Sequence, residues 1–238
     1  MMKYKRVLLK ISGESLCEPG GFGIDDAQTR EIAEMIAKVC KTGAQVAIVV
    51  GGGNLLRGKT FSKDSYIPRA TADYMGMLAT VMNATALREG LAISGQPARV
   101  LSAIEVPAIN ERFVRRNCIS YLEQNSVTIL AGGTGNPFFS TDTCAALRAA
   151  EIDADVIIKA TKVDGVFTDD PVTNPSAELI PKITYQDILH KDLKVIDHAA
   201  ISICRENNIP IRVINIFKEN NISDVLAGKD IGTLISNQ

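Results

Sequence analysis

The segment Gln45-Val46-Ala47-Ile48-Val49-Val50 and the glycines that follow it constrain the fold more than any other part of the sequence. The segment is a nearly continuous apolar run, which is typical of a strand buried on both faces of a parallel sheet. Gly51, Gly52 and Gly53 come directly after it. Because ligands of open α/β sheets bind beyond the carboxyl ends of the strands, this pattern predicts a ligand-binding turn at Gly51.

Short apolar strands alternate with amphipathic helices along the rest of the chain, which predicts an α/β fold with a doubly wound, mainly parallel sheet. The other expected strands are Val7 to Leu9, Arg99 to Leu101, Val127 to Leu130, Asp155 to Ala160 and Ile211 to Ile216. The first expected helix begins after an N-cap, Asp25 or Asp26, and stops at Gly43. The second contains Tyr74, Met77, Leu78 and Val81 and stops near Gly90. The third spans Phe113 to Leu122. Turn-forming residues between 160 and 175 predict a hairpin or an ordered loop.

Length and composition favour one domain, residues 1–238, with an ordinary globular balance. The net charge of −1 argues against nucleic-acid binding, and no apolar run reaches the ~18–20 residues that a transmembrane helix needs. No secretory signal pattern is visible, so we expect a cytoplasmic protein. The five cysteines are far apart in sequence and predict reduced, mostly buried thiols. His190 and His198 lack partners with metal-site spacing, so no protein metal site is expected there.

Two further segments are predicted to lie at strand ends beside the glycine turn. In the first, Lys10 to Gly13, a lysine closes an apolar strand; its ammonium group either meets a polar ligand or reaches solvent along the sheet end. The second, Gly132 to Asp142, combines glycines, hydroxyl groups and two phenylalanines before a helix capped by Thr141 or Asp142. It can serve a phosphate and a flat ring, or simply complete the core.

A P-loop is the competing interpretation of the glycine turn, because Gly53 to Thr60 fits the pattern GxxxxGK[ST]. The triple glycine lies upstream of the match rather than inside it. The residues after Thr60 show no helical periodicity, and no convincing strand ends in a second, metal-binding aspartate. The glycines alone are also compatible with a plain strand-to-helix turn.

The sequence as a whole resembles the bacterial uridylate kinases of the amino-acid kinase superfamily. Six segments between Lys5 and Ile235 carry the resemblance: Lys10 to Glu14, Gly51 to Gly58, Asp73 to Thr80, Thr134 to Phe139, Lys159 to Val166 and Lys194 to Asp197. Ser140 stands where the family often has threonine, and the stretch from Lys59 to Arg69 looks variable. The resemblance implies a three-layer αβα sandwich of the carbamate kinase-like fold, with the acceptor mainly on the N-terminal part and ATP mainly on residues 155–238.

The resemblance also implies a reaction, the transfer of the γ-phosphoryl group of ATP to UMP with Mg²⁺ carried by the ATP. The implied catalytic residues are Lys10, Arg57, Asp142, Lys159 and Asp197. The implied ATP contacts are Lys10, Ile11, Ser12, Gly13, Gly53, Arg57, Thr161, Phe167 and Asp170. The implied UMP contacts are Gly52, Asp73, Thr134, Gly135, Asn136, Pro137, Phe138, Phe139, Ser140 and Thr141. Asp73, Asp142 and Asp197 are equally compatible with simple helix-start carboxylates.

By the same resemblance, Glu18, Pro19, Gly20, Gly21, Phe22 and Gly23 form a segment for the activator GTP, UTP inhibits, and the protein is a homohexamer. The same six residues are also compatible with a plain surface turn. Two other functions stay open: a related kinase that phosphorylates a carboxylate or carbamate, and a nucleotide sensor without activity. Thr134 to Phe139 favours UMP over the first, and the cations Lys10, Arg57 and Lys159 argue against the second.

Overall fold

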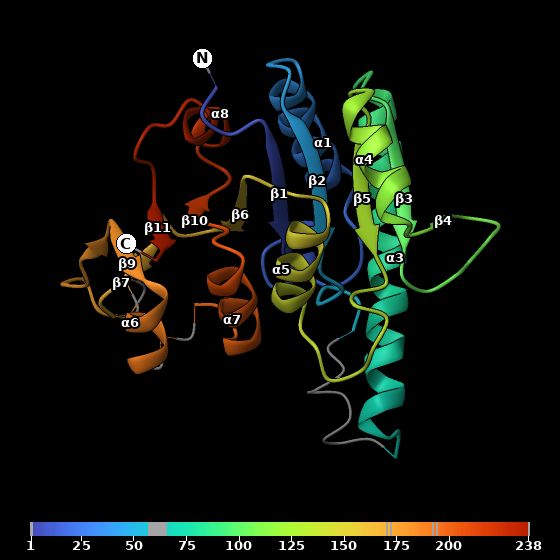
Figure 1. The fold of residues 1–238 in the computed structure, drawn as a ribbon. Coiled ribbons are helices and arrows are strands. Elements are labelled where there is room, and N and C mark those ends of the chain that lie inside the picture. Colours follow the sequence, from blue (N-terminus) through green and yellow to red (C-terminus); the bar gives the residue numbers. More distant parts are fainter. Residues whose placement is uncertain are drawn as a thin grey trace.

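The structure is a computed structural model that describes residues 2–56, 66–169, 171, 173–191, 193 and 195–237. A central sheet lies between two layers of helices (Figure 1), as the sequence predicts. In the described part of the chain, nine strands form this sheet in the order β4-β3-β5-β2-β1-β6-β10-β11-β9. All neighbours are parallel except β10 and β11.

The central strands occupy the expected places. The bounds of the nine strands are β1 Arg6–Ile11, β2 Gln45–Val50, β3 Ala98–Ser102, β4 Glu111–Arg112, β5 Val127–Ala131, β6 Val156–Thr161, β9 Lys182–Thr184, β10 Ile211–Asn215 and β11 Thr233–Ser236. The short edge strands β4 and β9 and the antiparallel β11 were not predicted. A separate antiparallel pair joins β7 (Val166–Phe167) to β8 (Leu179–Ile180), which confirms the hairpin but places its second strand beyond residue 175.

Each face of the sheet is covered by its own helices. One core contains residues of α1 (Asp26–Cys40), α3 (Arg69–Ile93) and α8 (Asn221–Leu226). The other contains residues of α4 (Arg115–Glu123), α5 (Thr141–Glu151), α6 (Tyr185–His190) and α7 (His198–Glu206). A short 3₁₀ helix, η1 (Gly13–Ser15), follows β1. The five cysteines are free and buried, as expected.

The ends of α1 follow the sequence signals closely. Asp25 is the N-cap, and its carboxylate accepts a hydrogen bond from the Gln28 backbone N–H at 2.8 Å. Gly43 has φ +86°, the left-handed conformation that glycine adopts without steric cost after a helix end.

The prediction that the second helix stops near Gly90 is wrong, because α3 continues through Gly90 to Ile93. A Cβ atom at Gly90 would lie 3.0 Å from the Cβ atom of Ala33 on α1. The glycine therefore allows α1 and α3 to approach each other closely, which is a packing role and not a helix stop. Figure 1 shows that the long α3 extends beyond the carboxyl ends of β1, β2 and β5.

Candidate active site

An open cleft of roughly 410 Å³ lies at the carboxyl ends of the central strands. Three of the predicted segments line it: Ser12 and Gly13 after β1, Gly51 to Gly53 after β2, and Gly133, Thr134 and Phe139 to Thr141 between β5 and α5. The remaining lining residues are Leu56, Gly76, Met77 and Thr80. The structure thus brings together the glycine-rich segments that the sequence placed at strand ends.

Two lysines and one carboxylate form a half-buried cluster beside this cleft. Lys10 on β1 and Lys159 on β6 stand opposite each other in the parallel register. Asp142 forms an ion pair with each of them: its Oδ1 lies 2.9 Å from Lys10 Nζ, and its Oδ2 accepts a hydrogen bond from Lys159 Nζ at 2.6 Å. Lys159 also donates to the backbone carbonyl of Val195. Three predicted catalytic residues therefore meet in one ion-paired group.

Asp142 reaches the lysines because α5 begins one residue before it, at Thr141. The expected N-cap, Thr141 or Asp142, is wrong: the N-cap is Ser140, whose hydroxyl accepts from the backbone N–H groups of Asp142 and Thr143 at 3.0 Å each. Because Ser140 caps the helix, the Asp142 carboxylate does not have to cap α5. This cap also places the carboxylate in the first turn of the helix, where the dipole favours negative charge.

Asp197, the fourth described catalytic prediction, fixes this arrangement from α7. Its carboxylate caps α7 by accepting from Ala200 N–H at 2.9 Å. It also accepts from the hydroxyls of Ser140 and of Thr143, the latter at 2.8 Å. Asp197 therefore acts as the helix-start carboxylate that the sequence left open and, in addition, ties the start of α7 to the start of α5.

Burial and charge act against each other in the cluster. Burial alone would raise the pKa of the Asp142 carboxyl, but the ammonium groups of Lys10 and Lys159 outweigh it and hold that pKa below its usual value. Burial lowers the pKa of Lys159, and Lys10 acts in the same direction. Asp142 is thus a carboxylate across the physiological range, and it lies between two basic side chains.

The predicted UMP segment is anchored to α3 through Asp73. The carboxylate of Asp73 accepts from Arg69 Nε at 2.8 Å and from the backbone N–H of Phe138 at 2.9 Å. Phe138 has φ +72°, an unusual conformation for a residue with a Cβ. Phe138 and Phe139 expose 69% and 56% of their surface, so they do not complete the core. Two exposed aromatic rings beside a cleft suit contact with a flat ligand.

The predicted ATP residues Thr161 and Phe167 lie at the end of β6 and on β7. The Thr161 hydroxyl is already engaged with the backbone carbonyls of Val163 and Ile214 at 2.7 and 3.0 Å. The next residue, Lys162, helps line a cavity of about 270 Å³ with Glu14, Ser15, Cys17, Pro19, Gln28, Asn215 and Phe217. This second cavity gives room for a ligand on the β6 and β10 side of the sheet.

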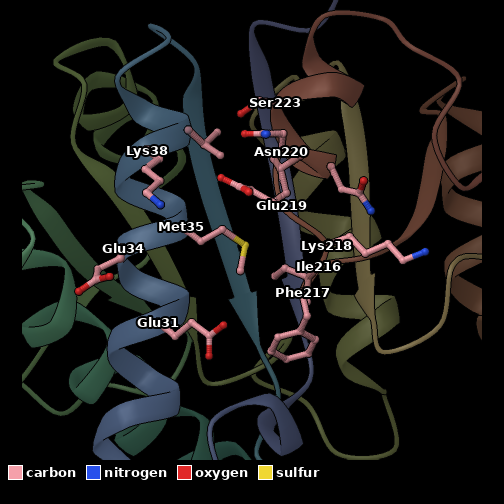
Figure 2. Close-up of a pocket in the computed structure, with 13 residues that line it drawn as sticks. Glu31, Glu34, Met35, Lys38, Ile216, Phe217, Lys218, Glu219, Asn220 and Ser223 are labelled. Atoms are coloured by element: carbon pink, nitrogen blue, oxygen red, sulfur yellow. The ribbon is translucent and has the colours of Figure 1, made fainter.

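A groove of about 180 Å³ lies between α1 and the segment after β10 (Figure 2). Glu31 and Met35 of α1 point toward the segment from Ile216 to Ser223, and Glu34 and Lys38 also line the groove. Phe217 lines both this groove and the cavity beside Lys162. None of the described residues that the sequence singled out as ATP or UMP contacts lines this groove, so it stands apart from the cleft.

Two site predictions, Arg57 and Asp170, lie outside the described residues. The segment from Glu18 to Gly23 precedes α1, and Phe22 on it is 81% exposed. Its backbone is joined to the glycine turn, because Gly23 N–H donates to the Asn54 carbonyl at 3.0 Å.

Sequence reasoning missed two hydroxyl residues that shape the site. Thr80 on α3 accepts from the backbone N–H of Gly132 at 2.8 Å, and Thr143 donates to Asp197. Both hydroxyls are buried or half-buried inside helices, where the sequence shows only a polar residue among apolar ones. No local pattern reveals which distant group such a residue will bind.

The carboxylates of Asp142 and Asp197 already contact protein groups. Among the residues described, no group of three or more His, Cys, Asp or Glu side chains could hold a metal ion. Both oxygens of Asp142 contact lysines, and Asp197 accepts from two hydroxyls. Mg²⁺ commonly keeps waters and binds substrate phosphates with few protein ligands, which agrees with this arrangement.

We expect Asp142→Asn to lower the free energy of unfolding at pH 7 by about 3 kcal/mol, because two half-buried ammonium groups lose their counter-charge. The lowered pKa of Asp142 contributes stability above the unfolded pKa of about 4 that is lost as the pH falls through the folded pKa. The difference between wild type and variant should therefore shrink below pH 4. Urea unfolding at several pH values measures it.

Asp25→Asn is the matched control, since asparagine caps a helix as well as aspartate does, and its unfolding free energy should stay close to wild type. A difference between wild type and Asp142→Asn that stays constant from pH 7 to pH 3 would contradict the assigned ion pairs.

Comparison with known proteins identifies the family. The model of the amino acid kinase family matches residues 5–215. A chloroplastic uridylate kinase of Arabidopsis thaliana is 50% identical over 234 residues, which cover 98% of this chain and 69% of that protein. The UMP kinase of Bacillus anthracis superimposes with a TM-score of 0.94 at 35% identity, covering 99% of this chain and 97% of the other. The UMP kinase of Ureaplasma parvum superimposes with a TM-score of 0.90 at 39% identity, covering 99% of this chain and 100% of the other.

These matches run through the cleft, the lysine cluster and the whole described sheet, and they leave the P-loop interpretation of Gly53 to Thr60 without support. The chain belongs to the amino acid kinase family and, within it, to the UMP kinases.

Proposed function

We propose that this protein transfers the γ-phosphoryl group of ATP to UMP and so forms UDP and ADP. The observation that carries the proposal is the pair of ammonium groups, Lys10 and Lys159, held by one carboxylate at the side of the glycine-lined cleft. Such a pair offsets the repulsion between two polyanions, which is the main obstacle to phosphoryl transfer between nucleotides.

No general base is needed in this reaction. The phosphate of UMP has a second pKa near ~6, so its attacking oxygen is already anionic at pH 7. Catalysis then consists of aligning the two phosphates and stabilising the charge that spreads over the transferring group. Lys10, Lys159 and the backbone N–H groups of the glycine turn supply these interactions, and Arg57 is assigned to the same task.

In this proposal the two nucleotides approach from opposite sides of the glycine turn. Lys10 to Gly13 and Gly53 contact the ATP phosphates, and the adenosine lies toward Thr161, Phe167 and Asp170. Gly52, Asp73 and residues 134–141 hold UMP, with the exposed rings of Phe138 and Phe139 beside the base. The cavity beside Lys162 supports an ATP position on the β6 and β10 side.

Mg²⁺ bound to ATP would supply charge neutralisation at the phosphates. Asp142 and Asp197 orient Lys10, Lys159 and the start of α5. We further propose that GTP activates through the segment from Glu18 to Gly23, that UTP inhibits, and that the protein assembles as a homohexamer in pyrimidine nucleotide synthesis.

Cytoplasmic location stays a prediction, since the Arabidopsis relative is named as chloroplastic. No helix among the described residues is long and apolar enough to cross a membrane.

The acceptor is tested by ADP release with Mg²⁺-ATP and a panel of UMP, CMP, dTMP, AMP, glutamate and carbamate. We expect the largest kcat/KM for UMP, because residues 134–141 offer backbone groups, hydroxyls and aromatic rings to a nucleotide. Activity confined to glutamate or carbamate would move the protein to another branch of the family. Binding of nucleotides without ADP release would leave the sensor hypothesis.

Lys10→Ala should lower kcat by roughly 10²–10³, the scale on which one preorganised electrostatic donor acts. Lys38→Ala, an exposed lysine on α1, is the matched control and should keep wild-type turnover. Steady-state kinetics on folded protein measures both. Near-normal turnover of Lys10→Ala would remove Lys10 from the catalytic group.

Titration with GTP at subsaturating UMP tests the proposed effector segment. We expect GTP to raise the rate, because the segment from Glu18 to Gly23 is bonded to the glycine turn through Gly23 and Asn54. A rate and a UMP saturation curve that do not respond to GTP would withdraw the effector assignment and leave a surface turn.

A further inference from the structure

Two buried asparagines lie directly beneath the glycine turn. Asn54 ends the turn and Asn83 is on α3; their exposed fractions are 2% and 0%. The two side-chain amides bind each other reciprocally, with Asn54 Nδ2 donating to Asn83 Oδ1 at 3.0 Å and Asn83 Nδ2 donating to Asn54 Oδ1 at 2.7 Å. Buried amides of this kind cost free energy unless every donor is satisfied.

The second N–H of each amide is used as well, and each reaches a different glycine. Asn83 Nδ2 donates to the carbonyl of Gly51 at 2.7 Å, and Asn54 Nδ2 donates to the carbonyl of Gly23 at 2.6 Å. All four side-chain N–H groups of the two asparagines therefore donate a hydrogen bond. Two of these bonds join the asparagines to each other, and two go to the backbone carbonyls of Gly51 and Gly23. A fully satisfied buried network of this type fixes one geometry.

The bond to Gly51 determines the direction of the next backbone N–H. No peptide bond in the described chain is cis, so the Gly51 carbonyl and the Gly52 N–H point in opposite directions. Since Asn83 holds the carbonyl, the Gly52 N–H is turned away from Asn83. Within the described residues, neither Gly52 N–H nor Gly53 N–H donates to another protein group, and both glycines line the cleft.

The same pair joins two further glycine segments to the turn. Gly23 and Asn54 exchange two hydrogen bonds, from Gly23 N–H to the Asn54 carbonyl and from Asn54 Nδ2 to the Gly23 carbonyl. A Cβ atom at Gly13 would lie 2.5 Å from Asn54 Oδ1 and 2.7 Å from the Gly51 carbonyl. The backbone after β1 thus packs against the amide pair at a distance that only glycine permits.

We propose that Asn54 and Asn83 are positioning residues for phosphoryl transfer: the pair sets the direction of the Gly52 N–H and couples the segment from Glu18 to Gly23 to the phosphate-binding turn. The inference rests on the proposed function of the cleft. Neither asparagine is needed to touch a substrate, since both act through the backbone of the turn.

Asn83→Asp tests the positioning role, because it keeps the size of the side chain and replaces the donor to Gly51 with an oxygen that repels the carbonyl. We expect kcat/KM for UMP to fall about 10- to 100-fold per folded molecule, the scale of a misplaced catalytic group. Leu87→Ala, one turn further along the buried face of α3, is the control for lost stability. It should lower the unfolding midpoint and leave the kinetics of folded protein unchanged.

An Asn83→Asp variant that loses only thermal stability, with kcat and both KM values at wild-type level, would overturn the positioning role. Circular dichroism at the assay temperature ensures that the comparison concerns folded protein.

Hydrogen exchange tests the coupling in a way that does not depend on the fate of Asn83→Asp. We expect the Mg²⁺ complex of β,γ-methylene ATP to slow exchange in residues 19–25 of wild type, and this slowing to disappear in Asn54→Ala. Unchanged exchange in wild type, or equal slowing in both proteins, would contradict the coupling. Because this measurement needs no acceptor, it stays informative if UMP proves not to be the substrate, and the acceptor panel alone decides that question.

Discussion

The register between β1 and β6 is the constraint on which the active site depends. It places Lys10 directly opposite Lys159, and both side chains lie on the α5 face, two residues beyond Leu8 and Ile157 in the same core. Like charges on neighbouring strands destabilise a sheet. The pair is tolerated because Asp142 lies between the two ammonium groups, and a change of one residue in register would turn one lysine toward the opposite core.

Asp142 in turn depends on how α5 begins. Ser140 caps the helix, and Asp197 accepts from both Ser140 and Thr143, so the start of α7 holds the start of α5. Strand register, helix cap and interhelical hydrogen bond act in series, and each is needed for the charge cluster. This is why the charge cluster and its supports come from β1, β6, α5 and α7 and not from a single loop.

The sequence was sufficient for the parts of this chain that local chemistry determines. The limits of β2, the N-cap Asp25 and the glycine turn follow from an apolar run, a capping side chain and three residues without Cβ atoms. The role of Gly90 was misjudged because it depends on Ala33 of α1, whose Cβ atom would lie 3.0 Å from a Cβ atom at position 90. A contact with another helix cannot be read from the local sequence. The cap at Ser140 and the role of Thr80 were missed for the same reason. The assignments of ATP and UMP residues came from resemblance and stay predictions.

The glycine turn shows why one motif is a poor guide to phosphate-binding architecture. In a P-loop, the lysine follows the glycines on the same loop, so one segment carries both the backbone cradle and the charge. Here the glycines follow β2 while the lysines come from β1 and β6, and the buried amide of Asn83 on α3 donates to the Gly51 carbonyl. The backbone N–H groups of the glycine turn and the lysine side chains therefore come from different strands, and the sheet holds these strands in alignment. Any change that shifts β2 relative to β1 must alter the distance between the Gly52 and Gly53 N–H groups and Lys10, even when every phosphate-binding residue is intact.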